Sequence, residues 1–360
     1  MLLPDVDGLS GALDVASRLR QALAEAFRIE GVELDIDASI GVVISGAHGA
    51  DAQTLLQRAD IAMYVAKQQK RGVVVYDPEN DDHSPERLSL LGQLRRGIER
   101  GELFLQYQPK IDLKTREVVG VEALVRWQHP DRGMVPPNDF IPLAEHTGLI
   151  GPLTEAVLNM ALAQVKVWSD VGHHIPVAVN ISARNLSDDA FADKVKGLLA
   201  RHAVASGLLE VEVTESAVML EPEKAARILN KLHAIGVRIA IDDFGAGYTS
   251  LAQLKNLPIS ELKIDKSFIL AMHANTDDAM IVKSMIDLGH SLSMRVVAEG
   301  IETVDAVNTL ADLQCDIGQG YHLCRPALPE ALMQWYGQHA VDALPRSLSG
   351  FPTYPERPAA

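Results

Sequence analysis

Acidic and amide side chains recur at or near the carboxyl ends of short apolar segments in the later part of the chain. The segments cover 118–127, 175–181, 209–213, 237–241, 261–264 and 295–298. The polar residues that they carry are Glu122, Asn180, Glu212, Asp242, Asp243, Lys263, Asp265 and Glu299. If the segments are parallel strands of one barrel, these ends meet on the face where such barrels carry out chemistry. We therefore take this set as the candidate site.

The residue types at these strand ends indicate a site for divalent cations. Several carboxylates that face one another repel strongly unless cations lie between them. Carboxylate oxygens and one amide oxygen suit Mg²⁺ or Mn²⁺ rather than a thiolate-bound metal. The adjacent pair Asp242 and Asp243 suits two ions about 3.5–4 Å apart that share one carboxylate.

Lys263 is the one basic residue of the set. Lys263 and Asp265 stand two residues apart, so on a strand both side chains face the same side. A lysine beside bound metals is disfavoured as a cation, so we expect its pKa to fall and its amine to orient or deprotonate a metal-bound water. The loop after Asp243 contains Gly245 and Gly247, which can adopt positive φ and approach a ligand closely.

Each of these residues has a plainer interpretation when it is taken alone. A single acid at a strand end more often caps the next helix or lies in solvent, and Asp242 and Asp243, taken alone, could equally well cap the next helix. Lys263 alone would be a snorkelling or ion-paired lysine. The convergence of so many such residues at successive strand ends is what favours a functional site.

The periodicity of the sequence predicts the elements that position these residues. Segments 103–111 and 118–127 alternate as strands around a short polar turn, which predicts an antiparallel hairpin. Short strands then alternate with helical spacing, as over 222–233, where Gly236 is placed to end the helix. Repeated βα units over about 250 residues predict a parallel (β/α)₈ barrel. An open doubly wound sheet is the alternative, although no G-x-G-x-x-G follows the first strand.

The first part of the chain has a different pattern. It is helical in spacing at 13–27 and 52–70 and strand-like at 35–44 and 73–76. A cluster of Pro, Asn, Asp and Ser at 77–85 predicts a linker. We therefore expect three parts, residues 1–82, 83–343 and 344–360, the last a Pro-rich tail without packed structure.

Composition and charge exclude several classes of protein. The 360 residues include 33 Lys+Arg against 48 Asp+Glu, a net charge of −15, and 47% are hydrophobic. This is a globular profile without a run of about 18 apolar residues or a secretory signal. Cys315 and Cys324 form no C-x-x-C pair, so we expect no disulfide framework, no cysteine-built zinc site and a cytoplasmic location. The acidic surface disfavours DNA, RNA and anionic membranes, so an anionic ligand must be small and held locally.

The motifs around the candidate site resemble those of the EAL domain, the cyclic-di-GMP phosphodiesterase family. The signature is the stretch Glu122-Ala-Leu-Val-Arg-Trp127, and the similarity extends over roughly 87–340. Further matching stretches are 106–109, 126–130, 140–148, 180–182, 212–215, 242–248, 262–265, 298–302 and 319–321. So many motifs in order make the resemblance highly specific. It implies a modified (β/α)₈ barrel with an antiparallel first strand, and hydrolysis of cyclic di-GMP to linear 5′-pGpG with two Mg²⁺ or Mn²⁺ ions.

The resemblance also implies a role for each site residue. The first ion would be held by Glu122, Asn180, Glu212 and Asp242. Asp242 would also contact the second ion, which Asp243 and Glu299 would help to hold. The catalytic residues would be Glu122, Lys263 and Glu299, with Lys263 positioning or activating the attacking water. The substrate site would be lined by Gln108, Leu124, Arg126, Asp265 and Gln319, with the donor fork of Arg126 suited to a phosphate. Glu215 would anchor the loop 242–250, which in this family lies near a dimer contact, and Glu302 would support the metal ligands.

Residues 1–82 resemble the C-terminal half of a GGDEF (diguanylate cyclase) domain, through 38–41 and 58–67. The resemblance begins just after the point where the Gly-Gly-Asp-Glu-Phe turn is expected, and no Gly-Gly pair occurs. We therefore expect no cyclase activity from this chain. A piece of a longer GGDEF–EAL protein, a misplaced start and a remnant that packs on the barrel stay open as explanations.

Three functions compete at this point. The leading one is an active phosphodiesterase, expected by resemblance to be a homodimer through the EAL domain. The alternatives are a module that binds cyclic di-GMP without cleaving it, and a purely structural barrel. Retention of Glu122, Lys263 and the pair Asp242-Asp243 favours the enzyme, because a silent receptor usually lacks one of them.

Overall fold

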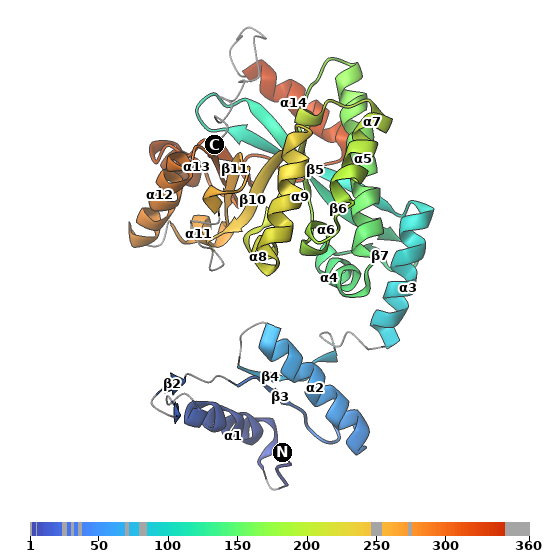
Figure 1. Ribbon diagram of the computed structural model, residues 1–360, viewed down its shortest axis with the longest axis vertical. Coiled ribbons are helices and arrows are strands. Elements are labelled where there is room, and N and C mark those ends of the chain that lie inside the picture. The colour runs from blue at the N-terminus through green and yellow to red at the C-terminus, as the bar shows by residue number, and fades with distance from the viewer. Residues whose placement is uncertain are drawn as a thin grey trace. The chain divides into compact units, whose positions relative to one another are not determined.

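The computed structural model describes residues 2–4, 6–23, 27–29, 32–34, 38–68, 72–78, 85–245, 254–272 and 276–342. The chain divides into two compact units, Met1–Leu94 and Arg95–Ala360 (Figure 1). The domain boundaries predicted after residues 82 and 343 stay predictions, and the tail at 344–360 lies outside the described residues.

Within the described part of the chain, eight strands of the second unit close into a barrel, and β7 (Gly133–Val135) adds a ninth beside β6. In order around the barrel they are β5 (Leu103–Asp112), β6 (Val118–His129), β8 (Val177–Asn180), β9 (Leu209–Thr214), β10 (Arg238–Phe244), β11 (Glu261–Ile264), β12 (Arg295–Ala298) and β13 (Ile317–Gly318). The first strand, β5, is antiparallel to both of its neighbours, β6 and β13. All the other neighbouring pairs of the barrel are parallel. The predicted barrel with an antiparallel first strand is therefore confirmed, and the open-sheet alternative is wrong.

Helices alternate with these strands and lie outside them (Figure 1). They are α3 (Pro85–Arg100), α4 (Pro137–Thr147), α5 (Ile150–Asp170), α6 (Ala183–Leu186), α7 (Phe191–His202), α8 (Glu215–Leu220), α9 (Pro222–Ala234), α11 (Lys266–Ala271), α12 (Thr276–Ser291), α13 (Val304–Asp312) and α14 (Pro329–Asp342). In α9 the apolar residues at helical spacing are buried, and Gly236 follows with a φ of 89°, as the sequence predicts for a helix end. In the described residues, no helix is both long and apolar enough to cross a membrane.

The pleat of the strands sorts side chains between two environments. On β9, Leu209, Val211 and Val213 are fully buried and alternate with Glu210 and Glu212, which are buried as well. Because successive side chains of a strand point to opposite faces, the apolar residues pack toward the helices and the glutamates point into the barrel. The alternation on β11 is the same, with Leu262 and Ile264 outward and Glu261 and Lys263 inward. The barrel interior is therefore charged.

In its described residues, the first unit holds two small sheets, two complete helices and the beginning of α3. Its elements are α1 (Gly8–Leu23), β1 (Phe27–Ile29), β2 (Val32–Leu34), β3 (Ile40–Val42), α2 (Ala52–Gln68) and β4 (Val73–Val75). β1 and β2 are antiparallel, β3 and β4 are parallel, and Ala12, Ala16 and Val42 form a small core. The predicted helix at 13–27 is wrong at both ends, because α1 begins at Gly8 and Phe27 belongs to β1, where it pairs with Leu34.

Candidate active site

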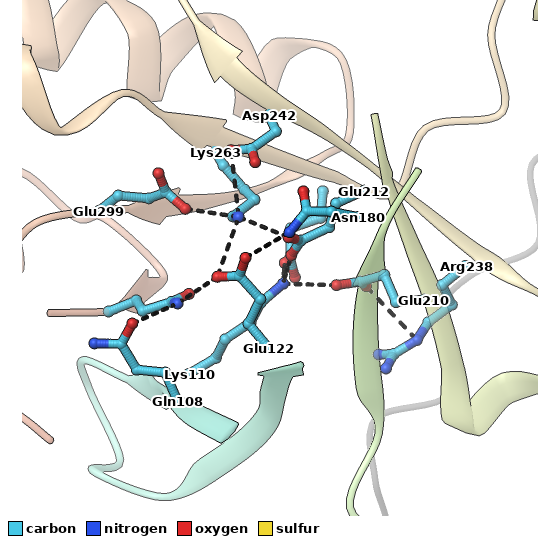
Figure 2. A network of polar contacts seen from close by, with 12 residues as sticks. Gln108, Lys110, Glu122, Asn180, Glu210, Glu212, Arg238, Asp242, Lys263 and Glu299 are labelled. Atoms are coloured by element: carbon cyan, nitrogen blue, oxygen red, sulfur yellow. Dashed lines mark hydrogen bonds and ion pairs between the residues drawn. The ribbon is translucent and has the colours of Figure 1, made fainter. Parts of the chain in front are cut away.

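Lys263 lies at the centre of the candidate site, and its ammonium contacts four carboxylates (Figure 2). Lys263 Nζ is 2.6 Å from Glu299 Oε1 and 2.8 Å from Glu212 Oε2. It is 3.3 Å from Asp242 Oδ1 and 3.6 Å from Glu122 Oε2. The five side chains come from five different strands or strand ends, so the barrel brings together residues far apart in the sequence. The predicted convergence of these side chains is therefore present.

The electrostatics of the site are dominated by its surplus of carboxylates. Burial opposes the charge of Lys263, but the carboxylates around it outweigh burial and raise its pKa well above the ordinary value. The predicted fall of this pKa depends on bound cations, and the protein's own groups act in the opposite direction. Burial, reinforced by Asp242, raises the pKa of Glu299 to about 8 and that of Asp243 to about 6. Unless further cations replace the protons, Glu299 is therefore largely protonated at neutral pH, whereas Asp243 is protonated mainly below about pH 6.

Asp242 and Asp243 share one side of the strand end despite being neighbours in the sequence. In a regular strand their side chains would point to opposite faces. The register between β10 and β11 shifts between Ile241 and Phe244, and Asp243 has a φ of 54°, a conformation uncommon outside glycine. As a result, oxygens of Asp242, Asp243 and Glu299 all lie within 4.8 Å of one another. Three converging carboxylates are a donor set that fits a hard divalent cation.

Three amide side chains surround Glu122 on the other side of the site. Asn180 Nδ2 donates to Glu122 Oε1 at 2.7 Å, and Gln319 Nε2 donates to Glu122 Oε2 at 2.6 Å. Gln319 Nε2 also donates to Gln108 Oε1 at 3.2 Å, and Gln108 stands directly opposite Glu122 in the β5–β6 register. The amides therefore fix the orientation of Glu122, and they join predicted substrate-binding residues to predicted metal ligands.

Gly320 allows Gln319 to reach Glu122, and sequence reasoning assigned it no role. A Cβ at Gly320 would lie 2.2 Å from both the backbone nitrogen and the carbonyl oxygen of Ile301. The close approach is fixed by Ile301 N, which donates to Gln319 O at 3.1 Å. The position of this glycine inside the stretch Gln319-Gly-Tyr321 was the available signal.

A cavity of about 270 Å³ opens beside the carboxylates. Its lining residues are Gln108, Glu122, Asp242, Lys266, Glu299, Gly300, Glu302, Gln319, Gly320 and Tyr321. Leu124, Arg126 and Asp265, which were predicted to line the substrate site, are not among them. The exposed Glu302 lies at the rim of this cavity.

The remaining predicted residues have identifiable contacts. Arg126 stands on β6 on the same face as Glu122 and Leu124, and its Nε donates to Gln106 Oε1 at 2.8 Å. Burial lowers the pKa of Arg126. Asp265 caps α11, because its side chain accepts a hydrogen bond from Ser267 N at 2.9 Å. Helix capping is the plainer role that we gave above to a single acid at a strand end. Asp265 also forms a hydrogen bond with Asp243.

Glu215 is buried at the start of α8 and contacts the loop that follows the adjacent aspartates. Its Oε2 accepts from Gly245 N at 3.1 Å, which agrees with the anchoring role predicted for it. Residues 246–250 of that loop lie outside the described residues.

A second group of carboxylates, which sequence reasoning missed, lies deeper in the barrel. Lys110 Nζ is 2.7 Å from an oxygen of each of Glu210, Glu212 and Glu261. Both glutamate-bearing strands place charged residues two apart within apolar segments, Glu210 with Glu212 and Glu261 with Lys263. This alternation was the signal in the sequence. We call the set around Lys110 the lower cluster and the set around Lys263 the upper cluster.

Comparisons with known proteins show the family of this chain. The chain belongs to the EAL domain family, whose model matches residues 91–326. The model named "Diguanylate cyclase, GGDEF domain" matches residues 1–73. Both resemblances predicted from the sequence are therefore confirmed.

Individual relatives carry related names. The chain is 41% identical over 335 residues to the bifunctional diguanylate cyclase/cyclic di-GMP phosphodiesterase MucR of Pseudomonas aeruginosa, covering 92% of this chain and 49% of MucR. It is 36% identical over 326 residues to the cyclic di-GMP phosphodiesterase PdeR of Escherichia coli, covering 90% and 49%. The chain thus spans about half the length of these curated relatives. A solved structure of PaMucR phosphodiesterase in complex with c-di-GMP is 45% identical, has a TM-score of 0.66, and covers 68% of this chain and 99% of that one.

Proposed function

We propose that this chain hydrolyses cyclic di-GMP to linear 5′-pGpG. The observation that carries the proposal is the upper cluster, in which one lysine lies within 3.6 Å of the carboxylates of Glu122, Glu212, Asp242 and Glu299. Two further observations support it. The cavity beside the cluster can admit a ligand, and relatives at 36–41% identity are named as cyclic di-GMP phosphodiesterases.

The upper cluster fits two Mg²⁺ or Mn²⁺ ions. Asp242, Asp243 and Glu299 have converging oxygens and, for Asp243 and Glu299, pKa values that burial and like charge have raised. Such oxygens gain from a cation. Glu122, Asn180, Glu212 and Asp242 would hold one ion, and Asp242, Asp243 and Glu299 the other. Bound ions would neutralise the charge on the phosphate and lower the pKa of a water molecule.

The residues of the chain would then position the reacting groups. Hydrolysis to 5′-pGpG adds a water oxygen to phosphorus and breaks one P–O3′ bond, and the 3′ oxygen leaves with a proton. Lys263, fixed among four carboxylates, would hold the attacking water in line with the phosphorus. Arg126 would bind a phosphate oxygen through its fork of N–H donors. Gln108 and Gln319 would hold Glu122 in place through the hydrogen bonds described above.

Product analysis by chromatography tests this function. The full chain is incubated with cyclic di-GMP and Mg²⁺ or Mn²⁺, beside an EDTA control and Glu122→Ala. Metal-dependent formation of 5′-pGpG, absent from both controls, is expected. Substrate that binds but stays intact would contradict the proposal and favour a silent cyclic di-GMP receptor. The expected homodimer is tested separately, by the mass of the protein in solution.

A further inference from the structure

Lys110 on β5 is buried and makes a complete set of ionic contacts. Its side chain is 3% exposed, and Nζ lies 2.7 Å from Glu210 Oε1, Glu212 Oε1 and Glu261 Oε1. An ammonium group has three N–H donors and no acceptor. Three carboxylates therefore use the full capacity of this lysine.

Glu212 links the lower cluster to the upper one (Figure 2). Its Oε1 faces Lys110 at 2.7 Å, and its Oε2 faces Lys263 at 2.8 Å. Oε1 has no hydrogen-bond partner in the described part of the chain, so the ion pair with Lys110 is the contact that holds this oxygen. The Glu212 side chain is 0% exposed, so bulk solvent does not reach this oxygen in the folded protein. The two lysines thus hold one carboxylate from opposite ends.

The lower cluster is closed by further cations. Arg295 Nη2 lies 3.0 Å from Glu261 Oε2, and Arg238 Nε lies 3.8 Å from Glu210 Oε2. Three basic residues therefore face three glutamates, and the formal charges balance. The cavity beside them measures about 10 Å³, and Lys110, Arg238 and Arg295 contribute to its lining. It has room for one water molecule at most, so a hydrated divalent cation does not fit.

We propose that Lys110 is a positioning residue for the reaction: it occupies the place of a metal ion in the lower cluster and fixes Glu212 with Oε2 toward the upper cluster. The inference rests on the proposed function, because it concerns the presentation of a ligand of the upper cluster. Without Lys110, the negative charge of Glu210 and Glu261 would repel Glu212, and nothing would hold its Oε1.

The test compares three variants of the full chain. Lys110→Met removes the charge at similar length. Lys110→Met combined with Glu261→Gln removes one charge of each sign, so the net charge of the lower cluster is unchanged. Glu261→Gln alone is the matched control, because it leaves Lys110 with both Glu210 and Glu212. Each protein is measured for thermal unfolding, for Mn²⁺ affinity from the electron paramagnetic resonance signal of free Mn²⁺, and for hydrolysis of cyclic di-GMP.

The expected pattern separates positioning from charge neutralisation. Lys110→Met loses stability, and the double variant recovers most of it. The double variant nevertheless binds Mn²⁺ at least tenfold more weakly than the wild type and needs correspondingly more Mn²⁺ for half-maximal hydrolysis. Glu261→Gln binds Mn²⁺ as the wild type does. If the double variant does not fold, Lys110→Gln, which keeps one donor group, is measured in its place with the same expectation.

Two results would overturn the inference. One is wild-type Mn²⁺ affinity in a folded variant that lacks Lys110, and the other is an equal loss of affinity in Glu261→Gln. A wild-type protein that neither binds Mn²⁺ nor hydrolyses cyclic di-GMP would instead contradict the proposed function. The two failures are therefore distinguishable.

Discussion

Two carboxylate clusters occupy the interior of the same barrel, and they differ in what surrounds them. In the lower cluster, Glu210, Glu212 and Glu261 face Lys110, Arg238 and Arg295. In the upper cluster, the ammonium of Lys263 contacts four carboxylates, of which Glu212 also contacts Lys110, and a cavity of about 270 Å³ adjoins them. Both clusters contain oxygen donors close enough to share one ion. A surplus of negative charge with access from a cavity, rather than the donor type, therefore distinguishes the cluster that we propose as the metal site.

The pKa values of Glu210 and Glu299 show this difference most clearly. Burial opposes ionisation of Glu210, but Lys110 and Arg238 lower its pKa to about 2. Burial, together with the negative charges of Asp242 and Glu122, raises the pKa of Glu299 to about 8, although Lys263 acts in the opposite direction. Burial raises the pKa values of Glu261 and Glu212, and the negative charge of Glu210 contributes to both increases. Within the lower cluster Glu210 thus carries the most firmly ionised carboxylate.

The largest expected effect is on catalysis and belongs to the upper cluster. Asp242→Asn removes the charge that both ions would share, and we expect the rate of hydrolysis to fall about 10³-fold, as when a main electrostatic group is lost. The midpoint of thermal unfolding should stay near that of the wild type, because Asp242 adds to a surplus of charge. The rate is measured from 5′-pGpG formation. A variant that keeps a tenth of the wild-type rate would contradict the assignment.

The opposite pattern is expected for the lower cluster. Glu210→Gln leaves Lys110 and Arg238 with a buried charge uncompensated, so the free energy of unfolding should fall by about 3–5 kcal/mol. Hydrolysis per folded molecule should be close to that of the wild type, since Lys110 still holds Glu212. Urea unfolding and the rate assay measure the two quantities. Loss of activity without loss of stability would reverse the distinction between the clusters.

Gly320→Ala tests the amide side of the upper cluster. The new Cβ would meet the backbone of Ile301 at 2.2 Å, so we expect a loss of about 1–3 kcal/mol in stability and a weaker contact between Gln319 and Glu122. Gly151→Ala is the matched control, since a Cβ there has no atom within 4 Å. The control should unfold at the wild-type denaturant concentration or above it. Equal behaviour of the two variants would contradict the packing argument.

The stability of the protein should also depend on pH. Glu299 and Asp243 have folded-state pKa values of about 8 and about 6, above the ordinary 4.5 and 3.8. Between its unfolded-state and folded-state pKa, each of these carboxyl groups binds more protons in the folded state than in the unfolded state. The free energy of unfolding therefore falls as pH rises from 5 to 8. Unfolding in EDTA at several pH values measures this slope. It should be shallower in Glu299→Gln, and a stability that rises with pH in this range would contradict the shifts.

The sequence predicted much of the barrel because its short strands share one local pattern of apolar residues. The segments 261–264 and 295–298 were predicted as strands and coincide with β11 and β12. Each is a short, buried segment bounded by turns, so local pattern suffices to define it. The ends of α1 were missed because the change from helix to β1 depends on the pairing of Phe27 with Leu34.

Long-range contacts explain what the sequence did not predict. The sequence predicted that Asp242 and Asp243 act as a pair, but not the register shift between β10 and β11 and the φ of 54° that place Asp243 beside Asp242. Two of the three carboxylate partners of Lys110, Glu210 and Glu261, lie 100 and 151 residues away. No local periodicity carries such information, and both features depend on closure of the barrel.

Anomalous diffraction from crystals of the wild-type chain grown with Mn²⁺ would test the distinction between the two clusters most directly. We predict two anomalous peaks among Glu122, Asn180, Glu212, Asp242, Asp243 and Glu299, and none among Glu210, Glu212 and Glu261. A peak in the lower cluster, at the position of the Lys110 ammonium, would contradict this account. Absence of both upper peaks at saturating Mn²⁺ would contradict it equally.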